Sequence, residues 1–303
     1  MTDEEFLLHD RITKIQSVIK QYGEENFYLS FSGGKDSTVM SGLVDMALPG
    51  NCIPRVYVNT GIEFQMIRDF VIRTQETDGR IKIITPDVPI RQMLGEVGYP
   101  FKSKTHSKIA SLYRRRGRTM TVQKYLGEDP GTHWSPQQSC PKILRYQFTP
   151  EFSEKGLKIS DKCCARLKEK PLEKWKKENG RKIAMVGLMR EEGGRRFHAN
   201  CLSFRENKLR SFQPLVAVSK SWEDWFIKTY GVEIAELYLE PYLFLRTGCK
   251  GCPYAIKLQQ ELDVLGTYFP NERKQCEAIW APVYAEYRRI GYRLKDGGKK
   301  NNE

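Results

Sequence analysis

Apolar positions in the first 85 residues alternate between helical spacing and short continuous runs. Near-helical spacing over 6–22 predicts an amphipathic first helix, and Gly23 is expected to end it. Two further helices and three buried strands are expected, with bounds at 38–47 and 64–75 for the helices and 27–31, 55–59 and 81–84 for the strands. Strands that alternate with helices imply βαβ units, hence an α/β fold with a parallel sheet and helices on both faces.

This rhythm breaks between residues 100 and 180, where Lys, Arg, Pro and Gln are frequent and no period is clear. We interpret this stretch as an insertion with short helices. Beyond it, the pattern predicts a strand at 183–187 and helices at 222–230, 256–266 and 271–290. The predicted organisation is an α/β domain over 1–240 with a basic, cysteine-bearing insertion at 100–180, followed by a CxxC segment and C-terminal helices over 241–303.

The segment Ser-Gly-Gly-Lys-Asp-Ser lies directly after the first expected strand and before a helix. Its glycines allow the backbone to approach a phosphate closely, and the following helix presents its positive end to the same anion. Lys35 adds a point charge, and the hydroxyls of Ser32 and Ser37 can donate hydrogen bonds. The segment lacks the spacing of a Walker A loop. Its position between a strand and a helix favours a phosphate site over a simple Gly33-Gly34 turn.

Asp36 has a different role from its neighbours, because a carboxylate repels a phosphate. Two roles are open for it: holding Mg²⁺, which prefers oxygen ligands, or fixing the loop. Three arginines follow the strand expected at 183–187, namely Arg190, Arg195 and Arg196. Cations at these positions suit charge that develops on a reacting phosphate, and the alternative is a solvated loop.

Composition limits the class of protein. The chain has 303 residues, of which 40% are hydrophobic and 29% are charged, as in an ordinary globular protein. No run of 18 apolar residues is found, so no membrane span and no membrane partner are expected. The acidic N-terminus does not resemble a signal peptide, and we expect a cytoplasmic protein. A formal net charge of +13 favours polyanionic ligands such as nucleotides, tRNA or DNA, or serves solubility alone. The oligomeric state is open.

The eight cysteines are clustered rather than scattered. Cys163 and Cys164 are adjacent, and Cys249 and Cys252 form a CxxC pair. Four thiolates in two pairs suit either Zn²⁺ or a [4Fe–4S] cluster, and plain buried cysteines are the alternative. Of the remaining cysteines, the sequence assigns core positions to Cys52, Cys201 and Cys276, and a structural, spare-thiol or sulfur-carrier role to Cys140.

The loop 32–37 resembles the PP-loop of ATP pyrophosphatases, which include tRNA thiolation enzymes and sulfonucleotide reductases. Three other segments resemble the phosphoadenosine phosphosulfate (PAPS) reductase branch: the motif VNTGIEF at 58–64, GLMREEGGRR at 187–196, and Pro214-Leu215 followed by Trp222 and Trp225. This resemblance implies a HUP-like, adenine nucleotide alpha hydrolase-like fold. It also implies binding of ATP or a related adenine nucleotide with Mg²⁺, and it adds Thr60 and Gly61 to the nucleotide site.

The tandem cysteines in CCARLKEKPL, with the distant CxxC pair, resemble the cluster-binding pattern of adenosine phosphosulfate (APS) reductases. The same pairing is similar to that of DNA phosphorothioation enzymes. The resemblance therefore implies that Cys163, Cys164, Cys249 and Cys252 hold a [4Fe–4S] cluster. Arg166, Lys168 and Lys170 would offset the negative charge of such a cluster.

Two departures from the reductase pattern bear on the reaction. The chain has no Glu-Cys-Gly-Leu-His-type tail with a nucleophilic cysteine, and it keeps the full SGGKDS loop that the reductases alter. Both departures favour a sulfur-metabolism transferase that adenylates an acceptor, releases pyrophosphate and supports sulfur transfer from a donor protein. Two alternatives stay open. One is an APS/PAPS reductase that forms sulfite, and the other is a non-catalytic nucleotide or nucleic-acid binding module.

A basic stretch at 101–118 contains seven Lys or Arg residues and no acid, with Tyr113 among them. Basic residues beside an aromatic ring suit phosphate contact together with base stacking. A second basic stretch, KEKPLEKWKK, covers 168–177. We therefore expect a tRNA or DNA substrate to bind the stretch that contains Arg114, Arg115 and Arg116. A solvated loop that closes over the nucleotide is the alternative.

Overall fold

The computed structural model describes residues 1–129, 139–193, 196–244 and 247–295. The chain forms two compact units, and each is built from two separate stretches of sequence. The first unit comprises 1–86 and 170–247, and the second comprises 87–169 and 248–303. Most of the predicted insertion and the C-terminal segment therefore belong to one unit, while the boundary expected at residue 240 stays a prediction.

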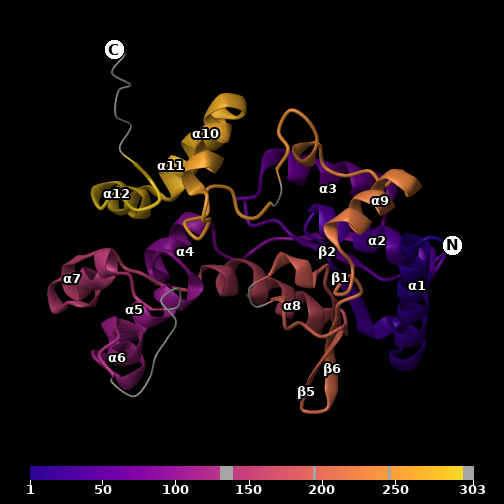
Figure 1. Ribbon diagram of the computed structural model, residues 1–303, viewed down its shortest axis with the longest axis horizontal. Coiled ribbons are helices and arrows are strands. Elements are labelled where there is room, and N and C mark those ends of the chain that lie inside the picture. The colour runs from indigo at the N-terminus through magenta and orange to yellow at the C-terminus, as the bar shows by residue number, and fades with distance from the viewer. Residues whose placement is uncertain (130–138, 194–195, 245–246, 296–303) are drawn as a thin grey trace. The chain divides into compact units, whose positions relative to one another are not determined.

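The first unit is organised around a six-stranded sheet in the order β3-β2-β1-β4-β6-β5 (Figure 1). The strands are β1 (Phe27–Ser30), β2 (Arg55–Val58), β3 (Ile81–Ile84), β4 (Ile183–Met185), β5 (Leu202–Arg205) and β6 (Lys208–Phe212). All neighbouring pairs are parallel except β5, which runs antiparallel to β6. The predicted parallel sheet is thus confirmed, and it carries an additional edge strand, β5, whose two-residue connection to β6 makes this pair an antiparallel hairpin.

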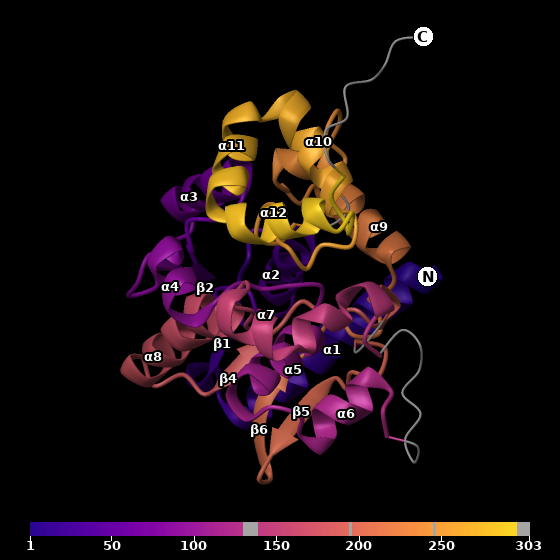
Figure 2. The ribbon, with the colours of Figure 1, turned by 90° about the vertical axis from the view of Figure 1, so that its left-hand side faces the viewer.

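Helices cover both faces of this sheet, as the sequence predicts. They are α1 (Asp3–Tyr22), α2 (Lys35–Ala47), α3 (Gln65–Thr77), α8 (Lys170–Glu178) and α9 (Lys220–Tyr230), with 3₁₀ turns at Glu24–Asn26, Arg190–Glu192 and Glu236–Tyr238. Helices α2 and α3 lie on one side of β1 and β2, and α8 lies on the other (Figures 1 and 2). Trp175 of α8 packs edge-on against Tyr28 of β1, with ring centroids 5.9 Å apart.

The buried apolar run of β1 explains its central position. Phe27 and Leu29 have no exposed surface, and Tyr28 is almost completely buried. A strand that is apolar on both faces is stable only when helices cover it on both sides. The polar loop that follows is therefore held at the carboxyl end of the innermost strand, where parallel α/β sheets bind their ligands.

The second unit is helical. Its elements are α4 (Ile90–Val97), α5 (Lys104–Arg116), α6 (Met120–Leu126), a 3₁₀ segment at Lys142–Phe148, α7 (Pro150–Lys155), a π-helical turn at Ala165–Glu169, α10 (Leu258–Tyr268), α11 (Pro270–Ile279) and α12 (Ala281–Arg289). Across the described residues of this unit, the only extended pairing is a bridge between Tyr99 and Ile159. None of the helices that the structure describes combines the length and apolar character needed to cross a bilayer.

Most elements agree with the expected ones within a few residues, and the differences have simple causes. The single helix expected at 271–290 is two helices, because Trp280 ends α11 and Pro282 lies in the first turn of α12. Proline favours the first turn of a helix and disfavours its interior. The sequence analysis also missed α4 and the β5–β6 hairpin, which are short and carry little periodic signal.

His106, to which the sequence assigns no role, lies in the core of the second unit. Its Nδ1 is 2.9 Å from Tyr125 Oη and its Nε2 is 2.7 Å from Gln147 Oε1. Burial lowers the pKa of His106 from 6.5 to about 3, despite the bond to Gln147. The folded protein therefore keeps this side chain neutral at pH values where the unfolded chain binds a proton.

The stability of the second unit is expected to depend on pH through His106. Its contribution is present above pH 6.5 and is lost as the pH falls toward 3. Between pH 7 and pH 5 this should remove about 2 kcal/mol from the free energy of unfolding. Urea denaturation at the two pH values should show this difference in the wild type and in the control His9→Asn, because His9 is exposed. An equally large difference in His106→Asn would contradict the assignment.

Candidate nucleotide and cysteine sites

The segment Ser32–Ser37 connects β1 to α2, in the predicted order of strand, loop and helix. Gly34 is the N-cap of α2, which begins at Lys35. Gly33 has a φ of 68°, and a Cβ at this position would lie 2.7 Å from Val71 Cγ2, so both the backbone and the packing require glycine. The first turn of α2, whose N–H groups lack partners within the helix, thus begins at the carboxyl end of β1.

Hydrogen bonds between its own residues hold the loop in shape. Ser32 Oγ lies 3.0 Å from Ser37 Oγ and accepts a bond from the Gly34 N–H at 3.2 Å. Ser37 Oγ also accepts from the Ser32 N–H and donates to the Gly34 carbonyl. These bonds organise the loop without using the side chain of Lys35 or Asp36.

A pocket of about 680 Å³ lies at the carboxyl edge of the sheet, within the first unit. The lining residues come from the loop, from the end of β4 and from the segment after α9: Ser30, Ser32, Gly34, Lys35, Asp36, Ser37, Val186, Gly187, Glu192, Arg196, Tyr238 and Thr247. A Cβ at Gly187 would lie 2.9 Å from the Asp36 carbonyl oxygen. The segment that follows β4 can therefore lie this close to α2 because residue 187 is a glycine. The pocket has the size and position of a small-ligand site.

The first turn of α9 carries the counter-ions of the loop. Lys35 Nζ lies 2.8 Å from Asp224 Oδ1 and 3.3 Å from Glu223 Oε2. Lys220 Nζ lies 2.8 Å from Asp36 Oδ1 and 3.3 Å from Glu223 Oε2. Burial alone lowers the pKa of Lys35, but the carboxylates of Asp224 and Glu223 raise it overall, so this side chain is a stable cation.

Glu223 is the buried centre of this ion-pair network, with no exposed surface. Burial raises its pKa, the Asp36 carboxylate raises it further, and the two lysines act in the opposite direction. Trp222 and Trp225 of this helix belong to a motif recognisable in the sequence, but the charged residues between and before them were not predicted as part of the site. The signal available was the run of charges in KSWED, whose relation to the distant loop only the fold can show.

Of the other residues predicted for this site, some line the pocket and others do not. Arg196 lines the pocket and forms an ion pair with Glu192. Arg190 donates from Nε to the Ala199 carbonyl at 2.8 Å and is not part of the pocket lining. Arg195 lies outside the described residues.

Thr60 and Gly61 follow β2 at the same edge of the sheet, but they do not line the pocket. Thr60 Oγ1 donates a hydrogen bond to Glu63 at 2.7 Å instead.

The four cysteines predicted to bind a cluster all lie in the second unit. Burial raises the pKa of Cys163, and the neighbouring thiols of Cys249 and Cys164 raise it further. Burial likewise raises the pKa of Cys252 well above its usual value, with Cys249, Cys163 and Cys164 acting in the same direction. The two pairs, about 85 residues apart in sequence, are therefore electrostatic neighbours.

The chemistry of this donor set fits an iron–sulfur cluster, because such a cluster takes four thiolate ligands, and here one thiol is buried and three are half-buried. Lys168 and Lys104 are close enough to lower the pKa of Cys163, as cations beside a negatively charged cluster would be. Among the described residues, no group of three or more His, Cys, Asp or Glu side chains is arranged to hold a metal ion. The cluster and its ligands accordingly stay a prediction.

The loop between Cys249 and Cys252 is fixed by α10, α11 and α12. The Gly251 N–H donates to Glu261 Oε1 at 2.7 Å, and the Gly251 carbonyl accepts from Tyr284 Oη. Lys250 Nζ forms a buried ion pair with Glu272 Oε2 at 2.7 Å. The C-terminal helices, which lie together in Figures 1 and 2, thus hold the CxxC pair in a defined conformation.

The four remaining cysteines differ in burial, and Cys201 is only half-buried, so its core assignment is not confirmed. Cys276 has no exposed surface, which confirms its core assignment, and burial raises its pKa to about 12. Cys140 is also buried, with a pKa raised to about 11. The core assignment of Cys52 is wrong: its thiol is exposed, because the residue lies in the connection between α2 and β2.

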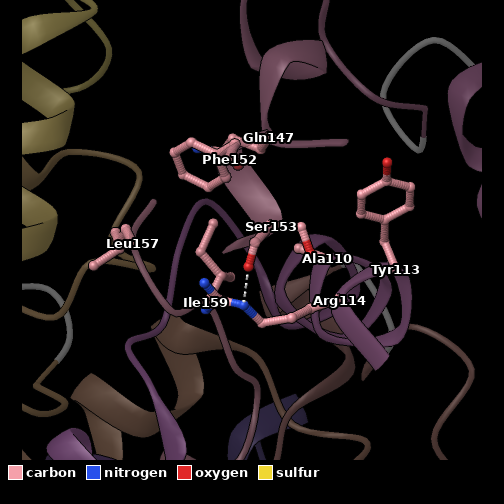
Figure 3. Close-up of a pocket in the computed structure, with 8 residues that line it drawn as sticks. All are labelled: Ala110, Tyr113, Arg114, Gln147, Phe152, Ser153, Leu157 and Ile159. Carbon is pink, nitrogen blue, oxygen red and sulfur yellow. Dashed lines mark hydrogen bonds between the residues drawn. The ribbon is translucent and has the colours of Figure 1, made fainter. Parts of the chain in front are cut away.

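The basic stretch 101–118 is the helix α5 with its flanking turns. Its structure contradicts the prediction that Tyr113 stacks on a nucleic-acid base. Tyr113 cannot stack on a base, because its ring is buried and packs edge-on against Phe148 at a centroid distance of 5.7 Å. Arg114 has an internal role as well. Figure 3 shows its Nε donating to the Ser153 carbonyl, at 2.6 Å, beside a pocket of about 220 Å³. Arg115 and Arg116 are exposed at the C-terminal end of α5.

The parallel sheet, with its SGGKDS loop between β1 and α2, defines an α/β fold of the PP-loop, adenine nucleotide alpha hydrolase-like class. The family model for the phosphoadenosine phosphosulfate reductase domain matches residues 26–135 and 137–255. The chain therefore belongs to the PAPS reductase domain family. The matched ranges include the loop, the pocket and all four cysteines proposed as cluster ligands.

Solved structures similar to this chain share little sequence with it. Phosphoadenylyl-sulfate reductase from Candida auris has 12% identity and a TM-score of 0.41, covering 78% of this chain and 91% of its own. FMN adenylyltransferase from Candida glabrata has 13% identity and a TM-score of 0.45, with coverages of 82% and 64%. The [4Fe-4S] U34-tRNA thiolase NcsA from Methanococcus maripaludis has 16% identity and a TM-score of 0.38, with coverages of 95% and 80%. No curated protein sequence matches the chain significantly.

Proposed function

We propose that this member of the PAPS reductase domain family is a cytoplasmic enzyme that binds ATP and adenylates an acceptor. The main support is the intact loop Ser32–Ser37, whose Lys35 and Asp36 line a pocket at the N-terminus of α2. A helix N-terminus and a lysine together suit the β- and γ-phosphates of a nucleotide. A sulfonucleotide such as APS has no such pyrophosphate group for the loop to hold.

In the proposed reaction, an oxygen of the acceptor attacks the α-phosphorus of ATP. The bond from this phosphorus to the bridging oxygen breaks, pyrophosphate leaves, and the acceptor carries AMP on its oxygen. Lys35 and the first turn of α2 would bind the departing phosphates, and Arg196 would offset the charge that develops on them. A sulfur nucleophile from a donor protein would then displace AMP.

The same proposal assigns a [4Fe-4S] cluster to the second unit, held by Cys163, Cys164, Cys249 and Cys252. When bound, such a cluster would supply a site that holds or delivers sulfur. The residues of this chain contribute thiolates and the nearby cations of Lys168 and Lys104. The conformation of the Cys249–Cys252 loop depends on hydrogen bonds with α10 and α12, so these helices would limit where the cluster can form.

We include a nucleic acid, tRNA or DNA, among the candidate acceptors. Fewer residues of the basic stretch 101–118 support this than its charge suggests, because Tyr113 packs against Phe148 and Arg114 donates a hydrogen bond to the Ser153 carbonyl. Arg115 and Arg116 are exposed next to each other and suit contacts with the phosphate backbone. Such contacts give affinity that falls as salt rises, without base specificity.

Pyrophosphate release tests the proposal directly. Anaerobic protein with Mg²⁺ and ATP should form pyrophosphate when a suitable acceptor from a panel of tRNA, DNA and small hydroxyl compounds is present. For a nucleic-acid acceptor, Arg115→Ala/Arg116→Ala should raise KM and flatten its salt dependence, because fewer counterions are released. The control Arg73→Ala changes an exposed arginine of α3. ATP binding without pyrophosphate release from any acceptor would favour a non-catalytic binding module.

An APS/PAPS reductase is the second candidate, because the family model carries that name. A reductase of this kind needs a nucleophilic cysteine, whereas Cys140 and Cys276 are buried thiols with raised pKa values. Thioredoxin-dependent sulfite formation from APS or PAPS distinguishes the two functions. We expect no sulfite, and robust sulfite formation would make the reductase the correct assignment.

A further inference from the structure

Two carboxylates from different helices face each other beside the phosphate loop. Asp36 lies in the first turn of α2 and lines the pocket, while Glu223 lies in the first turn of α9 and has no exposed surface. The Lys220 ammonium lies between them, 2.8 Å from Asp36 Oδ1 and 3.3 Å from Glu223 Oε2. The protein therefore holds one cation at a position that two carboxylates define.

The buried carboxylate of Glu223 has unused capacity at this position. Its Oε2 accepts from both Lys220 and Lys35, but no hydrogen-bond donor among the described residues meets its Oε1. Burying a carboxylate oxygen without a partner costs free energy, typically about 1–3 kcal/mol or more. Such an atom is retained more easily when a ligand satisfies it, and Mg²⁺ takes carboxylate oxygens as ligands.

The charges around the loop also require a further cation. Lys35 and Lys220 are outnumbered by Asp36, Glu223 and Asp224, so these five groups carry one net negative charge when all are ionised. A nucleotide phosphate bound by Lys35 would lie beside this surplus of negative charge. A divalent ion would reverse the sign, and Mg²⁺ in nucleotide sites is commonly held by one or two carboxylates together with phosphate oxygens and water.

We propose that Asp36 and Glu223 together form the divalent-cation site of the pocket, and that the metal ion and the Lys220 ammonium are alternative occupants of it. The inference rests on the proposed nucleotide function, which it deepens by naming Glu223 as the second carboxylate. On metal binding, Lys220 leaves Asp36 and its ammonium becomes available to a phosphate oxygen. The helix α9 thereby exchanges a lysine for a metal ion at the same two carboxylates.

The test measures how much Mg²⁺ the full-length protein needs for ATP binding, by calorimetry over a series of Mg²⁺ concentrations. In Glu223→Gln, the Mg²⁺ concentration for half-maximal ATP binding should rise at least about tenfold, since even indirect partners of metal ligands contribute 10–100-fold to metal affinity. In Lys220→Met it should fall, because the competing ammonium is gone. Glu76→Gln is the control: it neutralises an exposed carboxylate of α3 outside this ion-pair network, and the Mg²⁺ requirement should not change.

Circular dichroism establishes that each variant is folded. If Glu223→Gln does not fold, Lys220→Met still tests the exchange of the Lys220 ammonium for the metal ion. An unchanged Mg²⁺ requirement in both variants, with normal ATP binding by the wild type, would overturn the inference and leave the proposed function intact. If the wild type binds no ATP, the proposed function fails, and Mn²⁺ alone still tests the site. Electron paramagnetic resonance should then detect Mn²⁺ bound to Lys220→Met but not to Lys220→Met/Glu223→Gln; equal binding by both would refute the site.

Discussion

Replacing Lys35 with alanine is expected to weaken ATP binding severely while leaving the fold intact. Charge-assisted hydrogen bonds contribute about 1.5–3 kcal/mol each, so the loss of one lysine–phosphate contact should reduce affinity by about 10- to 150-fold. The side chain is at the N-terminus of α2, where no other lysine of the loop can replace it. Lys35 also pairs with the buried carboxylate of Glu223, so circular dichroism should first establish that the variant is folded.

Calorimetric titration with ATP and Mg²⁺ measures this effect. Asp36→Asn should also lose affinity, but through the metal ion, so its defect should lessen at high Mg²⁺ concentration whereas that of Lys35→Ala should not. The control is Lys20→Ala, which changes an exposed lysine in the last turn of α1. ATP affinity that is equal in the wild type and Lys35→Ala would refute the assignment of the loop as the phosphate site.

The sequence was sufficient to predict the central part of the fold, because this part is built from strong local patterns. The strands β1 and β2 are buried except at their last residue, and the helices that follow them are amphipathic over three turns or more. The loop 32–37 was found for the same reason: its function requires contiguous residues in a fixed local conformation. Short elements with neither property, such as α4 and the β5–β6 hairpin, were missed.

The network around the loop could not be predicted in this way. Glu223 and Lys220 are almost 190 residues from Asp36 in sequence and meet it only because α9 packs near α2. Tyr113 illustrates the opposite error. Its position within a basic stretch suggested an exposed ring, but helical periodicity directs it toward Phe148 while Arg115 and Arg116 remain at the surface. Local composition does not tell which face of a short helix is buried.

The cysteine site could be predicted in part from sequence motifs, and the rest of it depends on contacts that only the fold shows. The two pairs were recognisable as motifs, but their proximity across about 85 residues of chain depends on the second unit. The helices α10 and α12, whose bonds fix the Cys249–Cys252 loop, carry no motif at all. Residues such as Glu261 and Tyr284 are visible only once the helices are in place.

Substituting serine for any one of Cys163, Cys164, Cys249 and Cys252 is expected to remove the iron–sulfur cluster. A [4Fe–4S] cluster requires four thiolates, and serine is a poor replacement for a soft ligand. Anaerobically purified wild-type protein should contain about four iron atoms per chain and absorb visible light, and each variant should lose most of both. Cys52→Ser is the matched control, because Cys52 is exposed and lies in the first unit, so its iron content should equal that of the wild type. Wild-type protein with full zinc occupancy and no iron would show that the thiols bind zinc instead of a cluster. An equal loss of iron in Cys52→Ser would show that the loss is not specific to the four proposed ligands.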